Sequence, residues 1–436
     1  MQGGLLRLFG NDEVGRKGAL IKLKFAKVLN LVKSKKNYRR EKMRKIFLTA
    51  IALLSMASAS VFGMYGVDTD WIFFLTHGNQ FRARLDQLGF TLGNDTIKGT
   101  FGFDNNAGYG GVYGSLLSEN SEYPAQGRGF NYDFKPSISM GLGYTSSLIS
   151  VGVGYNVTIG KKDYKQNGNA DRTKPYNPVA HTPVLVLNAL DNAFRMAIPI
   201  QVYVMNDKDE NGTKNNITAV SVDSQFRYYT GLDALPQIRL YLRYGGGNYK
   251  AGTQSEKIGE SFGFDFRLYF GSMVEEVALQ PYVKLTYDGA LGKYHNNTRV
   301  EAVKIMNAGG FPVLSSVLAK GAWDLNLVAG LGLTANSDIV SLYLEPTLGL
   351  KVNQPGSTDK NAKEVYSLGY GVYAEIYITP LKNLEWYFEA QLGNLGGSGT
   401  YTTTDAAGAT THQVSFTKLG LGFNATTGIT WYLPAL

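Results

Sequence analysis

After Lys135 the chain alternates apolar and polar positions in segments of about ten residues. Between Leu148 and Gly160 the odd positions carry Ile, Val or Tyr, and the even positions carry Ser, Gly, Asn or Thr. Between Ser261 and Gly271 the even positions carry Phe or Leu, whereas Asp265 and Arg267 lie on the other face. A period of two places successive side chains on opposite faces of a strand. A membrane barrel turns its apolar face to lipid and its polar face to a wet interior, and charge on the second face favours this arrangement over a soluble sandwich.

Sixteen segments of the chain are candidate strands, of which the first three fit the pattern least well. If the N-terminal hairpin does not join the wall, the count falls to fourteen. Pro199, Pro281 and Pro346 lie inside candidate strands, where we expect bulges because proline donates no hydrogen bond. The candidates are Gln80–Leu92, Thr96–Phe103, Gly108–Leu117, Pro136–Thr145, Leu148–Gly160, His181–Leu190, Phe194–Met205, Ile217–Tyr229, Gln237–Gly246, Ser261–Gly271, Ala278–Asp288, Trp323–Ala335, Ile339–Asn353, Val365–Thr379, Leu384–Asn394 and Gln413–Leu433.

Short and long connections alternate strictly from Pro136 onward. Short periplasmic turns and long outer loops are typical of outer-membrane barrels. We therefore predict an all-β fold, an antiparallel transmembrane β-barrel over residues 80–436. The expected short connections are residues 146–147, 191–193, 230–236, 272–277, 336–338 and 380–383, and the expected long ones are 161–180, 206–216, 247–260, 289–322, 354–364 and 395–412.

The N-terminal part of the chain predicts export. Basic residues at 44 and 45 precede the uncharged apolar run Ile46–Ala57, which ends in the small-x-small pattern Ala57-Ser58-Ala59. This order is typical of a signal peptide, here residues 43–59. The run is shorter than the roughly 20 residues that a membrane-spanning helix needs. Residues 60–79 then form an N-terminal segment before the barrel.

Residues 1–42 form a basic leader that export signals do not normally carry. The leader contains 12 Lys or Arg against three acidic residues. We predict that translation starts at Met43 and that the leader is not part of the true precursor; the alternative is a start at Met1 with a leader that is cleaved or disordered. Without residues 1–45 the chain has 29 basic and 32 acidic residues, so the basic pI belongs to the leader. Nucleic-acid binding therefore loses its main support.

The residue inventory does not favour catalysis. The chain has no cysteine, which excludes disulfides, thiolate metal sites and a lipid-anchored N-terminal Cys. The four histidines, His77, His181, His295 and His412, lie at no metal-ligand spacing, and the GxSxG motif does not occur. We therefore predict no enzyme, cofactor or metal. A hydrolase dyad assembled from the outer loops is left open.

Twelve charged residues lie in phase with the inward face. They form either a salt-bridged, solvated interior or a path for ions and solutes in which opposed charges set a transverse field. Their signs nearly balance, so the sequence gives no selectivity, although Arg239, Arg243 and Arg267 are expected to form a guanidinium ladder. The candidate pore-lining residues are Arg195, Asp223, Arg227, Arg239, Arg243, Asp265, Arg267, Lys284, Asp324, Glu345, Glu385 and Glu389.

The insertion at residues 289–322 is the longest after Pro136 and contains a helical pattern. Thr298 and Glu301 fit a capping box, and apolar residues recur at 300, 303 and 306. The short helix either folds inward and narrows a pore or packs on neighbouring loops at the surface.

Three stretches near the N-terminus resemble the variable surface proteins of intestinal spirochaetes. They are residues 64–66 (MYG), 71–90 (WIFFLTHGNQFRARLDQLGF) and 93–103 (GNDTIKGTFGF). The resemblance covers residues 43–103, and the leader before Met43 departs from it. It implies an exported, surface-exposed outer-membrane antigen that varies in its loops. It implies neither a transport activity nor a catalytic residue.

These observations predict a surface antigen of the outer membrane with a porin-like, water-filled channel for passive diffusion of small solutes. The alternative is a closed barrel that serves as an adhesin or structural surface protein, and a barrel-borne hydrolase is third. The expected partners are outer-membrane lipid and, through the outer loops, host antibodies or surfaces, with no nucleic acid. The sequence leaves open whether the chain forms a homo-oligomer.

Overall fold

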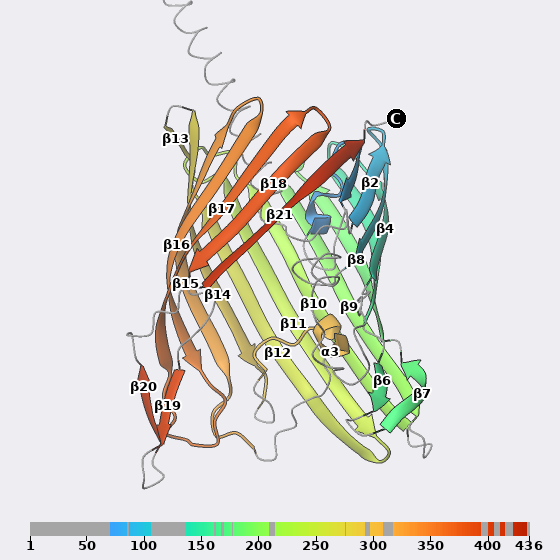
Figure 1. Cartoon of the computed structure of the whole chain (residues 1–436), viewed down its shortest axis with the longest axis vertical. Helices are drawn as coiled ribbons and strands as arrows, with labels where there is room; N and C mark the ends of the chain where they lie inside the picture. Colours follow the sequence, from blue (N-terminus) through green and yellow to red (C-terminus); the bar gives the residue numbers. More distant parts are fainter. Residues whose placement is uncertain are drawn as a thin grey trace, which may run out of the picture. The chain divides into compact units, whose positions relative to one another are not determined.

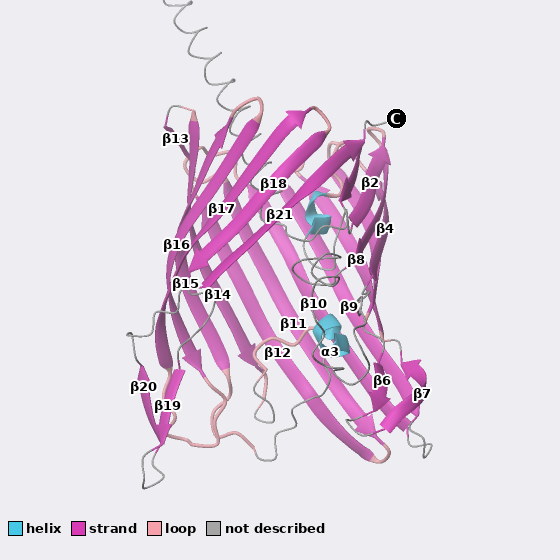
Figure 2. Ribbon diagram, viewed as in Figure 1, coloured by secondary structure: helices cyan, strands magenta, loops and turns pink. Residues whose placement is uncertain are grey.

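The computed structural model is built almost entirely from antiparallel strands (Figure 2). One compact unit, residues 59–436, contains every described residue. The expected leader and signal peptide, the candidate strand Gly108–Leu117 and His295 lie outside the described residues, and of His412 only the backbone, in the strand Thr410–Val414, is described. The structure describes residues 70–84, 87–105, 136–160, 163–166, 170–176, 178–208, 214–274, 276–292, 297–307, 317–393, 400–404, 410–414 and 422–433.

The order of elements along the chain is shown in Figure 1. The elements are η1 Asp70–Phe73, β1 Gln80–Arg84, β2 Gln87–Gly93, β3 Ile97–Asn105, β4 Pro136–Tyr144, β5 Ile149–Ile159, β6 Asp163–Gln166, β7 Ala170–Tyr176, β8 Val179–Ala189, β9 Phe194–Lys208, β10 Lys214–Tyr229, β11 Gln237–Ala251, β12 Gln254–Tyr269, β13 Ser272–Val274, β14 Val277–Ala290, α3 Ala302–Asn307, β15 Trp323–Asn336, β16 Val340–Gln354, β17 Val365–Leu381, β18 Leu384–Gly393, β19 Thr400–Thr404, β20 Thr410–Val414 and β21 Gly422–Leu433.

The main sheet closes on itself. Consecutive strands pair antiparallel around the wall, and β1 pairs with both β2 and β21. Because β12 and the short β13 both pair with β14, the 17 strands of this sheet make a wall of sixteen strands. The predicted antiparallel barrel of about sixteen strands is confirmed. The first and last strands differ from the prediction, since Gln80–Leu92 is the hairpin β1–β2 and the last strand begins at Gly422 instead of Gln413.

The two ends of the barrel differ, as the connection lengths predict. Residues 94–96, 145–148, 190–193 and 337–339 connect strands at the end where β21 finishes, here called the turn end (Figure 1). The opposite, loop end carries the hairpins β6–β7 and β19–β20.

Two of the predicted long loops are instead continuations of strands. Strands β9 to β12 have 15, 16, 15 and 16 residues. Their connections at the loop end shrink to residues 209–213 and to Gly252 and Thr253. A bilayer needs only about 9–11 residues of a tilted strand. Beyond that length water meets both faces, so the alternation disappears and the sequence has the composition of a loop.

The bulges expected at the three prolines are absent, and that prediction is wrong. Pro199 pairs with Val184, and the pairs on either side of it, His181 with Val202 and Leu185 with Ile198, keep the same register. Pro281 and Pro346 also pair in register, with Leu331 and Val372. In the described part of the main sheet, irregular register occurs between Gly247 and Asn248 and between Ile378 and Leu381.

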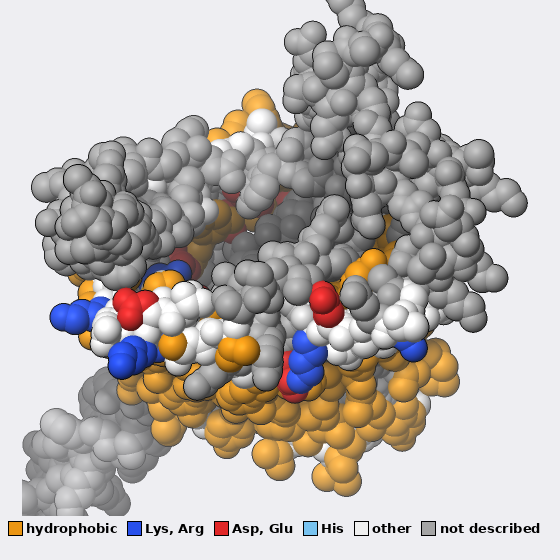
Figure 3. Space-filling model, turned by 90° about the horizontal axis from the view of Figure 1, so that it is seen from below, with side chains coloured by type: hydrophobic (Ala, Val, Ile, Leu, Met, Phe, Trp, Pro, Cys, Tyr) orange, Lys and Arg blue, Asp and Glu red, His pale blue; other side chains and the backbone are white. Residues whose placement is uncertain are grey.

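The two faces of the wall have opposite chemistry. Leu142 and Val153 point outward and are 60% and 58% exposed, whereas the inward Ser139, Ser150 and Asn156 are buried. Viewed from the loop end, hydrophobic side chains cover the exterior of the wall that is seen, and Lys, Arg, Asp and Glu gather at the rim (Figure 3). No helix in the described part of the chain is long and apolar enough to cross a membrane.

Apolar side chains inside the barrel form two clusters. The first contains Trp71, Ile72, Phe74 and Leu75 of the N-terminal segment. The second contains α3 and side chains of β8 to β12. Both clusters form because a segment that is not part of the wall packs against its inner face.

Candidate pore and its lining

Five basic residues form a row across five neighbouring strands. The register places Arg195 of β9 opposite Arg227 of β10, and Arg227 opposite Arg239 of β11. Arg239 is opposite Arg267 of β12, which is opposite Lys284 of β14. Directly opposite residues share a face and lie about 5 Å apart at Cβ, where like charges destabilise the sheet. The row therefore needs compensation from its surroundings.

Aromatic rings supply part of that compensation by stacking on the four guanidiniums. The Cζ atoms of Arg195 and Arg267 lie 4.6 and 4.7 Å from the ring centres of Tyr229 and Tyr241. Arg227 stacks on Phe73 and Arg239 on Tyr269, each at 4.4 Å. A desolvated cation–π contact contributes about 2 kcal/mol. Arg227 and Arg239 are both only 4% exposed, so this part of the lumen is filled rather than open.

A second charged group lies two inward positions closer to the loop end. Arg243 is 3.6 Å from Asp223, 3.5 Å from Asp265 and 3.2 Å from Asp288. Asp265 also accepts two hydrogen bonds from Arg267, at 2.8 and 2.7 Å. Arg239, Arg243 and Arg267 thus occupy the expected inward positions on two neighbouring strands, but carboxylates separate Arg243 from the other two guanidiniums. The guanidinium row runs across the strands, and Arg243 belongs to a carboxylate cluster.

The third group of charges is an acidic sector on β16 to β18. Glu345 accepts hydrogen bonds from Tyr282, at 2.8 Å, and from Tyr343. Glu389 lies opposite Glu375, whose carboxylate accepts a hydrogen bond from Tyr373. Glu385 accepts a hydrogen bond from Tyr432 at 3.2 Å. Asp324, the last of the twelve candidates, lies on β15 and pairs with Lys351 at 3.3 Å.

All twelve candidate residues lie on the inward face, in a basic sector on β9 to β14 and an acidic sector on β16 to β18, with Asp324 between the two on β15. Sequence reasoning missed Asp288, Lys351 and Glu375. Asp288 is in phase with Lys284, and Glu375 is in phase with the inward Gly369 and Gly371, so the period-two pattern already contained both.

The N-terminal segment enters the lumen as a plug, defined here as residues 70–79. The indole ring of Trp71 lies over Gly141 and Gly154, and the side chains of Phe74 and Leu75 lie over Gly143 and Gly152. A Cβ atom at Gly154 would come within 2.4 Å of the Trp71 ring, so the inner face needs glycine there. This close approach explains the Gly-x-Gly pairs of β4 and β5.

The polar end of the plug is held by basic wall residues. Arg195 donates to the Thr76 hydroxyl at 3.1 Å, and the Lys98 ammonium donates to the His77 carbonyl. His77 stacks on Phe73 with a centroid distance of 5.6 Å. Burial, together with the charges of Arg82, Lys98 and Arg195, lowers the pKa of His77 from 6.5 to about 3.

The helix in the longest insertion also lies inside the barrel. Ile305 and Met306 of α3 pack with Tyr203, Ile217 and Ala219, which belong to the inner face of β9 and β10. The amides of residues 300 and 302 donate to the hydroxyls of Ser261 and Ser221, at 2.7 and 2.8 Å. Of the two predicted positions, the inward one is therefore observed. The expected capping box does not form, because the Thr298 hydroxyl donates its hydrogen bond to Asp324.

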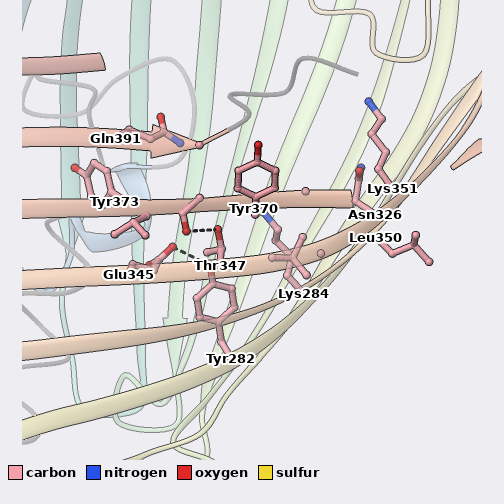
Figure 4. A pocket seen from close by; sticks show the side chains of 16 residues that line it. Tyr282, Lys284, Asn326, Glu345, Thr347, Leu350, Lys351, Tyr370, Tyr373 and Gln391 are labelled. Carbon is pink, nitrogen blue, oxygen red and sulfur yellow. Dashed lines mark hydrogen bonds between the residues drawn. The ribbon is translucent and has the colours of Figure 1, made fainter. Parts of the chain in front are cut away.

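The plug and α3 leave one side of the lumen accessible. Inward residues of β4 to β12, such as Thr182, Gln201 and Gln225, are buried, whereas the inward residues of β16 and those at 324–330 of β15 are half-buried. A cavity of about 300 Å³, here called the lumenal cavity, lies along β14 to β18 (Figure 4). Its lining includes Tyr282, Lys284, Asn326, Glu345, Thr347 and Tyr373.

A closed antiparallel wall with an apolar exterior and a charged, partly filled lumen defines the class of β-barrel proteins. Within this class the chain belongs to the variable surface protein family of Serpulina hyodysenteriae, whose family model matches residues 44–432. The resemblance in residues 43–103 thus extends over nearly the whole sequence.

Comparison with curated proteins gave no match. Among solved structures, the chain is similar to OmpT (in-vitro folded), an outer membrane protein of Vibrio cholerae, with 10% identity over 82% of this chain and 97% of that one. The TM-score of 0.30 is too low for this similarity to define the fold, which the strand pairing establishes by itself.

Proposed function

We propose that the protein is a surface-exposed β-barrel antigen of the outer membrane, with a channel for small solutes along β14 to β18. The observation that carries the channel is the contrast between the buried inward face of β4 to β12 and the half-buried, charged inward face beside the lumenal cavity. Opposed charges on a wetted wall are a common basis of selectivity in pores.

Membership of a surface protein family and the apolar exterior support the outer-membrane location. A closed barrel also satisfies its backbone hydrogen bonds within the wall, which lipid requires. In the outer membrane the turn end would face the periplasm. The loop end, with β6–β7 and β19–β20, would then meet host antibodies or surfaces.

The rival function is a closed barrel that acts as an adhesin or structural surface protein. The observation in its favour is that two segments, the plug and α3, already occupy the lumen. A hydrolase has less support in the described residues, because His77 is half-buried in the plug and His181 contacts Tyr155 on the outward face. No metal-binding group of acidic and histidine residues occurs in the described ranges. We therefore propose no enzymatic activity.

Recording from folded protein in planar lipid bilayers tests the channel. Discrete conductance steps are expected, and they should disappear when the same preparation is heat-denatured before insertion. Folded protein that inserts without any steps would remove the channel and leave the surface role in place.

A further inference from the structure

The lumenal cavity exists because its floor is built from glycines. Gly349 of β16 lies opposite Gly369 of β17, and Gly371 lies opposite Gly393 of β18. A Cβ atom at Gly369 would meet only the Gly349 carbonyl, at 3.7 Å, so the space above it is empty. The volume of about 300 Å³ lies at the lower end of small-molecule sites. The cavity therefore suits a small solute.

The cavity carries opposite charges toward its two ends. Glu345 lies toward the turn end, and Lys284 lies toward the loop end, with Thr347 between them (Figure 4). Tyrosine hydroxyls donate to both oxygens of Glu345 and fix this carboxylate in place. In the part of the chain that the structure describes, no carboxylate lies within ion-pair distance of the Lys284 ammonium, whereas the nearby Lys351 pairs with Asp324. Arg267, Asp265 and Glu345 are the charged groups that act on Lys284, and neither of these two carboxylates pairs with its ammonium directly, so a ligand carboxylate could do so.

The spacing of these charges selects the length of the ligand. Gly330 of β15 lies opposite both Tyr282 of β14 and Thr347 of β16, so these two residues are at the same level of the barrel. Glu345 is one inward position from Thr347 toward the turn end, and Lys284 is one inward position from Tyr282 toward the loop end. At about 3.3 Å per residue this places their Cα atoms about 13 Å apart along the strands, and the two side chains shorten the gap between the charges. An extended peptide spans at most about 3.3–3.6 Å per residue, so two or three residues bridge the remaining gap.

We propose that the lumenal cavity is a binding site for short zwitterionic peptides of two or three residues. The peptide ammonium faces Glu345, the terminal carboxylate faces Lys284, and the glycine floor leaves room for the peptide backbone between them. Thr347 and the inward amide of Gln391 border the same space. The inference deepens the proposed channel function, because such a site would lie on the path of diffusion.

Isothermal titration calorimetry of the folded barrel in detergent micelles tests the site by measuring its affinity for triglycine. We expect Lys284→Gln and Glu345→Gln each to weaken triglycine binding at least tenfold, and the exposed turn substitution Lys382→Gln to leave it unchanged. N-acetyl-triglycine, which lacks the ammonium, should bind equally to the parent and to Glu345→Gln. Triglycinamide, which lacks the carboxylate, should bind equally to the parent and to Lys284→Gln.

Triglycine that does not bind the folded parent, or binds both variants as well as the parent, would overturn the site. If Glu345→Gln does not fold, binding of N-acetyl-triglycine and triglycinamide to the parent protein tests the site instead. Each should bind at least fivefold more weakly than triglycine, and equal affinity of all three compounds would overturn the proposal. Conductance without triglycine binding would refute the site and keep the channel. Binding without conductance would refute the channel and keep the site.

Discussion

Gly154 lies directly beneath the indole ring of Trp71, which is fully buried. We expect Gly154→Ala to favour release of the plug by about 1–3 kcal/mol, because overpacking has a cost of this size. Acrylamide quenching of Trp71 measures the release, in protein whose other three tryptophans are replaced by Phe. Gly369→Ala is the matched control, since its new Cβ would be 3.7 Å from the nearest atom. Equal quenching in the two variants would contradict the docking of Trp71 on Gly154.

Arg243 is the residue on which the carboxylate cluster depends. Its side chain is 12% exposed and lies within 4 Å of Asp223, Asp265 and Asp288. Removing one partner of a buried ion pair costs about 3–5 kcal/mol, so we expect Arg243→Gln to lower the free energy of unfolding by about 3 kcal/mol. Urea unfolding in lipid vesicles gives this difference.

Arg299→Gln is the control, because the Arg299 side chain is 38% exposed and a solvated pair contributes at most about 1 kcal/mol. Equal losses in the two variants would show that the Arg243 cluster is solvated and contributes little.

For single residues, the sequence predicted which face of a strand a side chain occupies but not which side chains it contacts. Period two placed Arg227 and Arg239 inward, and this is what the structure shows. Their aromatic partners depend on the register between strands and on Phe73, which comes from outside the wall. The register is fixed partly by strand extensions that carry no apolar alternation, so the sequence could not reveal it.

The plug is the element whose stability should depend most on pH. Its His77 has a pKa of about 3 when docked and 6.5 in the reference state. Since the released form binds more protons between these values, docking is fully stable above pH 6.5 and weakens as the pH falls toward 3. At pH 5 the loss is about 2 kcal/mol.

Trp71 quenching between pH 7 and 5 measures the effect, and His77→Gln should make it independent of pH in this window. The charged groups around His77 are Arg82 of β1, Lys98 of β3 and Arg195 of β9. A pH response that persists in His77→Gln would assign the effect to other groups.

Elements with alternating sequence were predictable, whereas inserted elements were not. Strands β4, β5, β8 to β12 and β14 to β18 match candidates from the sequence because lipid on one side and water on the other impose the pattern. The run Trp71–Leu75 does not alternate, since every side chain in it is buried, and nothing local identifies the wall that covers it. The inward position of α3 likewise depends on Ser221 and Ser261, far away in sequence.

For the whole molecule, the arrangement of turns and loops predicts where protease reaches it in intact cells. Trypsin should cut in residues 161–174 and 207–214, which contain several Lys and Arg and whose described residues belong to β6, β7 and the loop-end tips of β9 and β10. Lys382, exposed between β17 and β18 at the turn end, should stay intact until the cells are lysed. Mass spectrometry of the fragments identifies the cleavage sites, and cleavage at Lys382 in intact cells would show that the barrel has the opposite orientation in the membrane.

The central claim is that ions pass along β14 to β18, and cysteine labelling during single-channel recording tests it most directly. The chain has no cysteine, so a single introduced thiol is the only target. Thr347 lines the lumenal cavity, and the inward Thr182 on β8 is fully buried. A negatively charged methanethiosulfonate should lower the conductance of Thr347→Cys and leave that of Thr182→Cys unchanged. An unchanged current through fully labelled Thr347→Cys, or a block confined to Thr182→Cys, would contradict the account.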